Sequence, residues 1–449
     1  MARPGGTLRI ARALPVAVAA LSVALIGAAL SVPAATAQAA KPKAAEIGIT
    51  ETQIRIAVIA DVDTPVQPGL FKASVDAVQA WAKAVNQQGG VGGRKVVVDF
   101  IDSKLNPNAT RNAIITACSQ DFAMVGGEAL FMSNVDDMVA CKDAAGNPIG
   151  IPDLPGLALD NNEKCSPVTY IVNGDASFCA TRTDHPQTYT AQQGDYLYYL
   201  KKNKDLHGIW TVPADLAATK NSELPIFQAG VDLGIKKDGA GFYDISASSP
   251  QSALTPFVQV IKSNGSTFAY NGSSAGIMVL FRREATLQGV DSVKVWACNQ
   301  GCYDTNFLQQ GGSDVDGTQS VLTTLPFYSE YKQNLSLKAL ASGVGGISNV
   351  NSSSLSSWIA SLLFQDAVGK ATANGGTLTR QSLFDALKAE HSFNASGIMG
   401  PLDVGNHKQP ACIVMTQVKN GKWVRTYPTK AGTFDCNKNN LVQIKMDLS

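Results

Sequence analysis

A strand–helix–strand unit near the start of the chain constrains the fold most strongly. Residues 53–60 form a β-rich run with isoleucine and valine on both faces, which is typical of a parallel sheet covered by helices. Apolar residues then recur at helical spacing as far as Val85, and the pair Gly89–Gly90 ends this helix. A second β-rich run begins at Lys95. The unit predicts a right-handed β–α–β crossover and therefore an α/β protein.

The same alternation continues along the chain. Helical spacing predicts helices at 108–119, 134–145, 188–202, 224–233, 253–263, 277–288 and 358–373. Short apolar runs predict strands at 122–125, 148–151, 207–212, 242–245, 267–270 and 293–297. Thr379 is expected to cap one further helix, and a final hairpin is expected at 412–424. The order of these predicted helices and strands along the chain favours two successive α/β units.

The first residues read as an export signal. Three arginines precede an apolar run at 13–32, and small-residue cleavage motifs end at Ala37 and Ala39. A membrane anchor is the alternative, since the run is nearly long enough to span a bilayer. Its alanine-rich composition and the adjoining cleavage motif favour a signal peptide at 1–39 and an extracytoplasmic protein. No cysteine precedes Cys118, so no lipoprotein attachment is expected.

Composition agrees with an exported, globular protein. The net charge is +1 and no basic cluster occurs, which argues against a nucleic-acid partner. Eight cysteines suit a disulfide set in an oxidising compartment. Eight allow about 105 connectivities, but short loops close at lower entropic cost, so we expect neighbours to pair. The expected pairs are Cys118 with Cys141, Cys165 with Cys179, Cys298 with Cys302, and Cys412 with Cys436.

A zinc site is the competing reading of the cysteines. The spacing C-x-x-C is absent, and no histidine lies close to a cysteine pair in the sequence. We therefore expect no metal and no cofactor.

Two segments carry a resemblance to a known family. The first helix closes with NQQGGVGGRK at 86–95, and the chain later passes through a Gly-Pro-Leu turn at 400–402 into its final hairpin. This order resembles the type I periplasmic solute-binding proteins, the leucine/isoleucine/valine-binding group of ABC importers. The likeness covers nearly all of the chain after the signal segment.

The resemblance implies an architecture of two Rossmann-like lobes, a Venus-flytrap fold, joined by three hinge crossings. The crossings are expected near 179–185, 318–326 and 397–403. The N-terminal lobe would then be 40–182, completed by 323–397, and the C-terminal lobe 183–322, completed by 398–449. The implied partners are a small-molecule ligand, either an amino acid or an apolar organic solute, and an ABC permease, with the protein itself a monomer.

The ligand contacts expected from this fold lie in the loops that follow the strands, because open parallel sheets bind ligands at their carboxyl ends. In the first lobe the expected contacts are Asp61, Val62, Gly69, Glu128, Ala129, Leu130, Phe131, Asp153, Leu154 and Pro155. In the second lobe they are Asp215, Leu216, Asn271, Ser273, Ser274 and Gln300.

The ligand expected here differs from the amino acids of that family. The first-lobe loops lack the serine and threonine hydroxyls that hold an α-carboxylate there, and Gln300 stands where a glutamate would meet the ammonium. A neutral amide cannot neutralise a buried ammonium. We therefore expect an apolar solute, aromatic or carboxylate-bearing, with free leucine, isoleucine and valine binding weakly. Glu128, Asp153 or Asp215 remains an alternative source of the missing charge.

Two other functions fit parts of the sequence. A ligand sensor that presents its closed form to a receptor would have the same two lobes. Residues 272–276 match the nucleophile motif G-x-S-x-G with Ser274 at its centre, and Asp291 or Asp304 followed by His391 gives a hydrolase order. The rest of the chain does not follow a hydrolase layout, and small residues also suit a ligand loop. No enzyme activity is expected.

Overall fold

The computed structural model describes residues 46–64, 68–215 and 217–448. The expected signal peptide at 1–39 and the expected ligand contact Leu216 lie outside these ranges. Among the described residues, no helix combines the length and apolar character needed to cross a bilayer.

The first lobe is built on a parallel sheet of four strands in the order β2-β1-β3-β4. Its strands are β1 (Gln53–Ala60), β2 (Lys95–Asp102), β3 (Ala123–Val125) and β4 (Asp153–Leu154). The predicted β–α–β unit is confirmed, with α1 (Lys72–Gln87) connecting β1 to β2. Gly90 has a φ of +85°, and a Cβ there would lie 1.9 Å from the carbonyl oxygen of Arg94. The turn after α1 therefore requires glycine.

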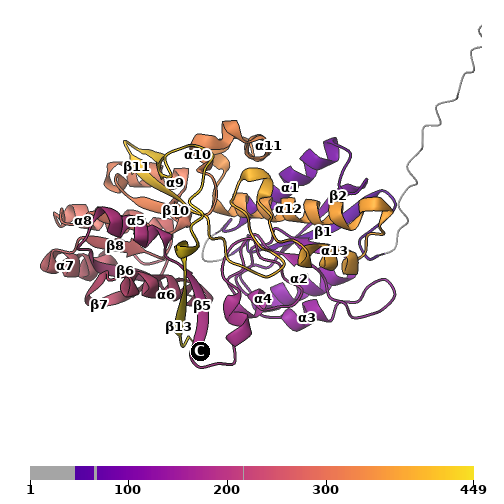
Figure 1. Ribbon diagram of the computed structural model, residues 1–449, viewed down its shortest axis with the longest axis horizontal. Helices are drawn as coiled ribbons and strands as arrows, with labels where there is room; N and C mark the ends of the chain where they lie inside the picture. Colours follow the sequence, from indigo (N-terminus) through magenta and orange to yellow (C-terminus); the bar gives the residue numbers. More distant parts are fainter. Residues whose placement is uncertain (1–45, 65–67, 216, 449) are drawn as a thin grey trace, which may run out of the picture. The chain divides into compact units, whose positions relative to one another are not determined.

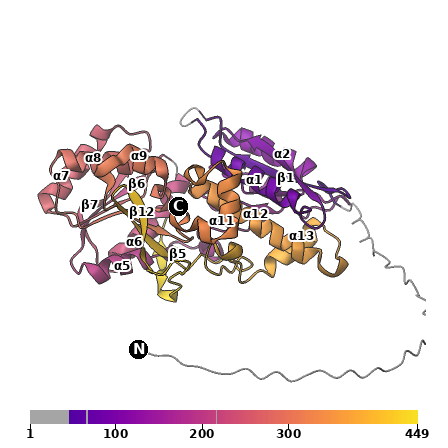
Figure 2. The same cartoon turned by 90° about the horizontal axis from the view of Figure 1, so that it is seen from above.

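Helices from two distant parts of the chain cover this sheet (Figures 1 and 2). The early ones are α2 (Pro107–Gln120), α3 (Val135–Val139) and α4 (Asn161–Lys164). The late ones are α11 (Leu335–Gly343), α12 (Ser352–Ala371) and α13 (Arg380–Lys388). Trp81 of α1 packs edge-on against Phe364 of α12. Thr379 accepts a hydrogen bond from the backbone of Ser382, so its predicted role as a helix cap is confirmed.

The second lobe is built on a seven-stranded sheet in the order β12-β11-β10-β9-β8-β6-β7. Strands β6 to β10 run parallel and β11 and β12 form the predicted antiparallel hairpin. The strands are β6 (His207–Pro213), β7 (Lys236–Ile245), β8 (Phe268–Asn271), β9 (Val295–Cys298), β10 (Gln319–Leu322), β11 (Val414–Lys419) and β12 (Lys422–Tyr427). The helices are α5 (Gly194–Lys202), α6 (Ala217–Asp232), α7 (Thr255–Asn264), α8 (Ala275–Leu287) and α9 (Thr305–Gly311). The short helix α10 (Phe327–Glu330) follows the second predicted crossing, and its Glu330 forms an ion pair with Arg425 of β12.

The chain passes between the lobes where two pairs of segments run side by side. Strand β5 (Gln187–Gln192) pairs antiparallel with β13 (Leu441–Met446), and both lie at the lower centre of Figure 1. Thr324 forms a β-bridge with Met399, which joins segments of the second and third predicted crossings. The predicted lobe boundaries themselves remain a prediction.

Three local predictions are wrong. The helix expected at 188–202 is the strand β5 followed by α5, because residues 187–192 pair with a strand about 250 positions later in the chain. No strand forms at 148–151, where the N–H groups of Gly150 and Ile151 bond instead to carbonyls at the end of α3. The helix expected at 134–145 is confined to Val135–Val139.

All eight cysteines form disulfides with their neighbours in the sequence. Among the described residues, no group of histidine, cysteine, aspartate or glutamate is arranged to hold a metal ion. The bonds are Cys118–Cys141, Cys165–Cys179, Cys298–Cys302 and Cys412–Cys436.

Candidate functional site

A cavity of about 180 Å³ is walled by both lobes and by the strand β5 between them. The first lobe contributes segments that follow β4, namely 157–159, Asn161, Lys164, 173–175 and Phe178. Strand β5 contributes Tyr189, Thr190 and Gln192. The second lobe contributes Asp195, 221–223, Pro225, Ile226, Tyr270, Asn299, Gln300, Val321, Thr323, Gln409 and Pro410.

Much of this wall is apolar. Phe178 and Tyr189 are stacked with ring centroids 5.0 Å apart, and both line the cavity together with Ile226, Val321 and Tyr270. Aromatic and aliphatic surfaces of this kind are usual in pockets that hold small organic molecules. The cavity can therefore accommodate an apolar body.

The lobes are linked at one corner of the cavity through Lys164. Its ammonium donates to the hydroxyl of Ser222 at 3.1 Å, which connects α4 of the first lobe to α6 of the second. Burial lowers the pKa of Lys164, and the carboxyls of Asp175, Glu163 and Asp160 act in the opposite direction. The positive charge at this corner is thus already surrounded by acidic groups.

Two carboxyls for which no cationic partner is found among the described residues also line the cavity. Asp195 lies in the first turn of α5 and is fully buried. Within the described part of the chain, its carboxylate receives no side-chain hydrogen bond, and the only compensation comes from the local backbone. Burial raises the pKa of Asp195 to about 7.

Glu223 of α6 is the second of these carboxyls. One of its oxygens accepts a hydrogen bond from the side-chain amide of Asn299 at 3.1 Å, and the other has no partner among the described residues. Burial raises the pKa of Glu223 to about 7, and the charge of Asp195 adds to the effect. The buried amide of Gln192 also leaves both polar atoms unbonded.

An aromatic layer explains why these carboxyls are so poorly solvated. Tyr196 and Tyr199 of α5 pack with Phe268 and Tyr270 of β8 at centroid distances of 6.0 to 6.3 Å. The indole N–H of Trp210 donates to the hydroxyl of Tyr196 at 3.2 Å. Water is excluded on this side, so the ionised form of a neighbouring carboxyl is disfavoured.

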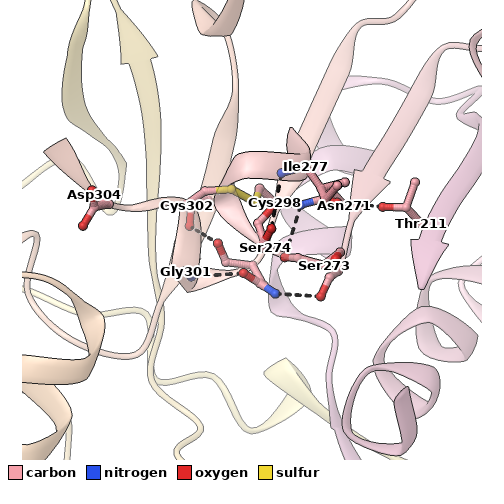
Figure 3. The surroundings of a disulfide bond; sticks show 12 residues. Thr211, Asn271, Ser273, Ser274, Ile277, Cys298, Gly301, Cys302 and Asp304 are labelled. Carbon is pink, nitrogen blue, oxygen red and sulfur yellow. Dashed lines mark hydrogen bonds between the residues drawn. A yellow bond between two sulfur atoms is a disulfide. The ribbon is translucent and has the colours of Figure 1, made fainter. Parts of the chain in front are cut away.

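The loops that follow β8 and β9 are joined by a hydrogen bond from the side-chain amide of Asn299 to the carbonyl of Gly272 at 3.1 Å, and Figure 3 shows this region around the disulfide Cys298–Cys302. Asn271 accepts a hydrogen bond from Thr211 at 2.7 Å and donates to the carbonyl of Ser274 at 3.0 Å. The hydroxyl of Ser274 accepts from the backbone N–H of Ile277 at 3.3 Å and so caps α8. Of the predicted contacts in these loops, only Gln300 lines the cavity.

This arrangement does not support the hydrolase alternative. The hydroxyl of Ser274 is engaged in a helix cap, whereas the His391 ring bonds to Asp403 at 2.7 Å. In the described ranges no hydrogen bond joins His391 to Ser274. A nucleophilic serine needs a base within hydrogen-bond reach, and Ser274 has no such bond to His391. Its hydroxyl serves as a helix cap instead.

The predicted contacts Asp61, Val62 and Gly69 lie in the interior or the loops of the first lobe. The buried carboxylate of Asp61 accepts hydrogen bonds from the backbone N–H of Leu105 at 2.7 Å and of Leu130 at 2.8 Å. The N–H of Gly69 bonds to the carbonyl of Val62 at 2.8 Å. These residues hold the loops after β1, β2 and β3 together.

Asp153 and Leu154 were expected in a loop, and this expectation is wrong because they form the strand β4. Asp153 accepts a hydrogen bond from Thr169 at 2.8 Å, and burial raises its pKa to about 7. Burial likewise raises the pKa of Glu128 to about 7. Asp153, Ala129 and Pro155 line a separate void of about 10 Å³ inside the first lobe.

The remaining predicted contacts also lie away from the cavity wall. Asp215 accepts hydrogen bonds from the hydroxyl of Ser246 and from the backbone N–H of Ala247. Leu130, Phe131 and Ser273 are likewise absent from the lining. Whether any of these residues touches a ligand stays a prediction.

Sequence reasoning missed the residues that dominate the cavity. Lys164, Gln192, Asp195 and Glu223 lie on α4, β5, α5 and α6, and no motif marks them. The available signal was an acidic residue at the start of an aromatic helix, as in Asp195 before Tyr-Leu-Tyr-Tyr. Two of these residues, Asp195 and Glu223, are carboxyls that the sequence analysis did not single out; weak binding of free amino acids stays a prediction.

Comparison with known proteins finds likeness over most of the chain. A family model described as periplasmic binding protein matches residues 53–422, and no curated protein matches the sequence. A leucine-binding protein from Thermotoga maritima aligns with a TM-score of 0.59 at 15% identity, covering 83% of this chain and 97% of that one.

Other solved structures share the same fold. A fatty acid ABC transporter substrate-binding protein from Thermomonospora curvata has a TM-score of 0.62 at 17% identity, covering 88% of this chain and 98% of that one. An ABC transporter substrate-binding protein from Aeropyrum pernix has a TM-score of 0.66 at 15% identity, covering 86% and 97%. At these identities the structural matches show the fold alone.

Proposed function

The chain belongs to the periplasmic binding protein family, and on that premise we propose that it captures a small organic solute between its lobes for an ABC permease. The observation that carries the proposal is the cavity walled by both lobes and by β5. A site divided in this way forms only when the lobes approach each other. Binding a solute there stabilises the closed arrangement, which is the form a permease would recognise.

Unbonded polar atoms on the cavity wall support ligand binding. Among the described residues, the carboxylate of Asp195 has no side-chain hydrogen-bond partner, and one oxygen of Glu223 and the amide of Gln192 have no partner. All three side chains line the cavity. A buried polar group without a partner costs about 1–3 kcal/mol. A bound solute that supplies donors or acceptors here would remove that cost.

The bond between the lobes supports closure as part of the function. Lys164 of the first lobe donates a hydrogen bond to Ser222 of the second lobe, and both residues line the cavity. We propose that residues 40–182 with 323–397 move against residues 183–322 with 398–449. The protein acts outside the cytoplasm as a monomer after removal of residues 1–39.

Native mass spectrometry of the exported protein tests solute capture. We expect one small molecule per chain, lost on unfolding in urea, and a smaller radius of gyration by X-ray scattering when the recovered solute is returned. A chain that carries no solute and keeps one radius of gyration with every candidate solute would contradict capture. Closure by the solute without any binding to the permease complex would instead favour a sensor.

A further inference from the structure

The charged groups of the cavity fall into two unequal sets. At the Lys164 corner, one ammonium is accompanied by Asp160, Glu163 and Asp175. The other set, which we call the acidic corner, consists of Asp195 and Glu223. Within the described ranges, none of the groups that perturb these two carboxyls is a lysine, arginine or histidine.

The acidic corner is not explained by packing within the protein. Asp195 is fully buried and has no side-chain donor, and burying a charge without a partner is strongly unfavourable. The neighbours that face it are Tyr196, Tyr199 and Tyr270 together with Glu223. Burial raises the pKa of each of these tyrosines, so they stay neutral near pH 7 and supply no charge.

A second observation points to a ligand at the same place. Gln192 is 6% exposed, and neither its amide nitrogen nor its oxygen is bonded within the described part of the chain. It lines the same cavity as Asp195 and Glu223. The buried side chains of Asp195 and Gln192 and the half-buried side chain of Glu223 therefore line one cavity from three different elements. Each of them has at least one buried polar atom without a side-chain hydrogen-bond partner among the described residues.

We propose that the acidic corner binds the protonated amine of a ligand that has an aromatic or aliphatic body and no carboxylate. This inference rests on the proposed function and names its solute class. An ammonium donates up to three hydrogen bonds, which suits two carboxylates and one amide oxygen. The stacked rings of Phe178 and Tyr189 lie in the same wall to pack against the apolar body.

The Lys164 corner argues against a carboxylate on this ligand. Its single positive charge is opposed by Asp160, Glu163 and Asp175, so a ligand carboxylate would add a further negative charge to an acidic surrounding. The cavity of about 180 Å³ has room for roughly a dozen water-sized positions. That volume suits an amine of roughly ten non-hydrogen atoms better than a long acyl chain.

Binding of an ammonium requires the carboxyls in their ionised form. In the empty cavity the pKa of Asp195 and of Glu223 is about 7, so a bound cation displaces a proton. The affinity is therefore expected to rise about tenfold between about pH 6 and pH 8 for one displaced proton. A neutral or anionic ligand would show no such rise.

Isothermal titration with three compounds that share one body tests the class: phenethylamine, phenylalanine and phenylacetate. We expect phenethylamine to bind most tightly, phenylalanine more weakly and phenylacetate not measurably. Asp195→Asn and Glu223→Gln should each weaken phenethylamine binding at least about tenfold, the loss expected when one charge-assisted contact is removed. Asp232→Asn removes an exposed charge from the same helix as Glu223 and should leave binding unchanged.

The outcomes separate this inference from the proposed function. Equal or tighter binding of phenylalanine or phenylacetate, or unchanged binding by Asp195→Asn and Glu223→Gln, would overturn the amine class and leave solute capture intact. Failure of all three compounds to bind would also overturn it, while a solute found by native mass spectrometry would still support capture. Thermal melts of each variant show whether it is folded.

Discussion

Replacing Asp195 by asparagine should stabilise the empty protein at alkaline pH. The side chain is fully buried beside an aromatic layer, and its ionised form finds no cation. Asparagine has nearly the same shape but carries no charge to desolvate. The variant therefore loses the ligand contact proposed above and at the same time becomes more stable without ligand.

The size of the effect follows from the raised pKa of Asp195. Its ordinary value is 3.8 and burial raises it to about 7. Because the folded state then holds the proton more tightly than the unfolded state, this group favours folding at low pH. That contribution is lost as the pH rises through the folded pKa. Between about pH 5 and pH 8 the loss amounts to about 2.5 kcal/mol.

Urea unfolding at several pH values between about 5 and 8 measures this contribution. The free energy of unfolding of Asp195→Asn minus that of the wild type should increase by about 2.5 kcal/mol across this range. Buried carboxyls that Asp195 does not perturb, such as Asp121 with its pKa raised to about 8, titrate alike in both proteins and cancel in the difference. A difference that stays constant with pH would refute the reasoning.

Two further substitutions test other parts of the structure. Ser274→Ala should cost about 1 kcal/mol of stability by removing a helix cap, and a serine-directed phosphonate should leave wild-type Ser274 unlabelled; stoichiometric labelling would instead indicate a nucleophile. Lys164→Met leaves its acidic neighbours without their cation. The free energy of unfolding should therefore fall by about 3 kcal/mol near pH 8, seen as a lower melting temperature. The fall should be smaller near pH 5, because burial raises the pKa of Glu163 and of Asp175 and so favours their neutral forms as the pH decreases; an equal fall at both pH values would show that the charge is not the cause.

The sequence predicts the parts of this fold that depend on local pattern. The strand β1, the helix α1 and the glycine turn at Gly90 are set by residues close to each other in the chain. The same holds for Thr379 as a helix cap. Each of these features follows from periodicity or from a backbone conformation that only certain residues adopt.

The parts that were missed depend on contacts between distant segments. Residues 187–192 become a strand only because 441–446 lies beside them, and no local pattern contains that information. The cavity wall has the same origin, since Lys164 of the first lobe lines one cavity with Asp195 and Glu223 of the second only after the two lobes have met. Gln300 was found because it directly follows a strand, where the general rule for open sheets applies.

The pairing of β5 with β13 determines when, during synthesis of the chain, the wall of the cavity can form. Tyr189, Thr190 and Gln192 belong to the strand that forms one wall of the cavity. Their partner strand ends at Met446, so a growing chain has both sheets' parallel strands in place long before this wall is complete. A product that lacks residues 441–446 would lose the partner of β5 and with it the complete wall between the lobes. The binding site is therefore completed later than the parallel strands of either sheet.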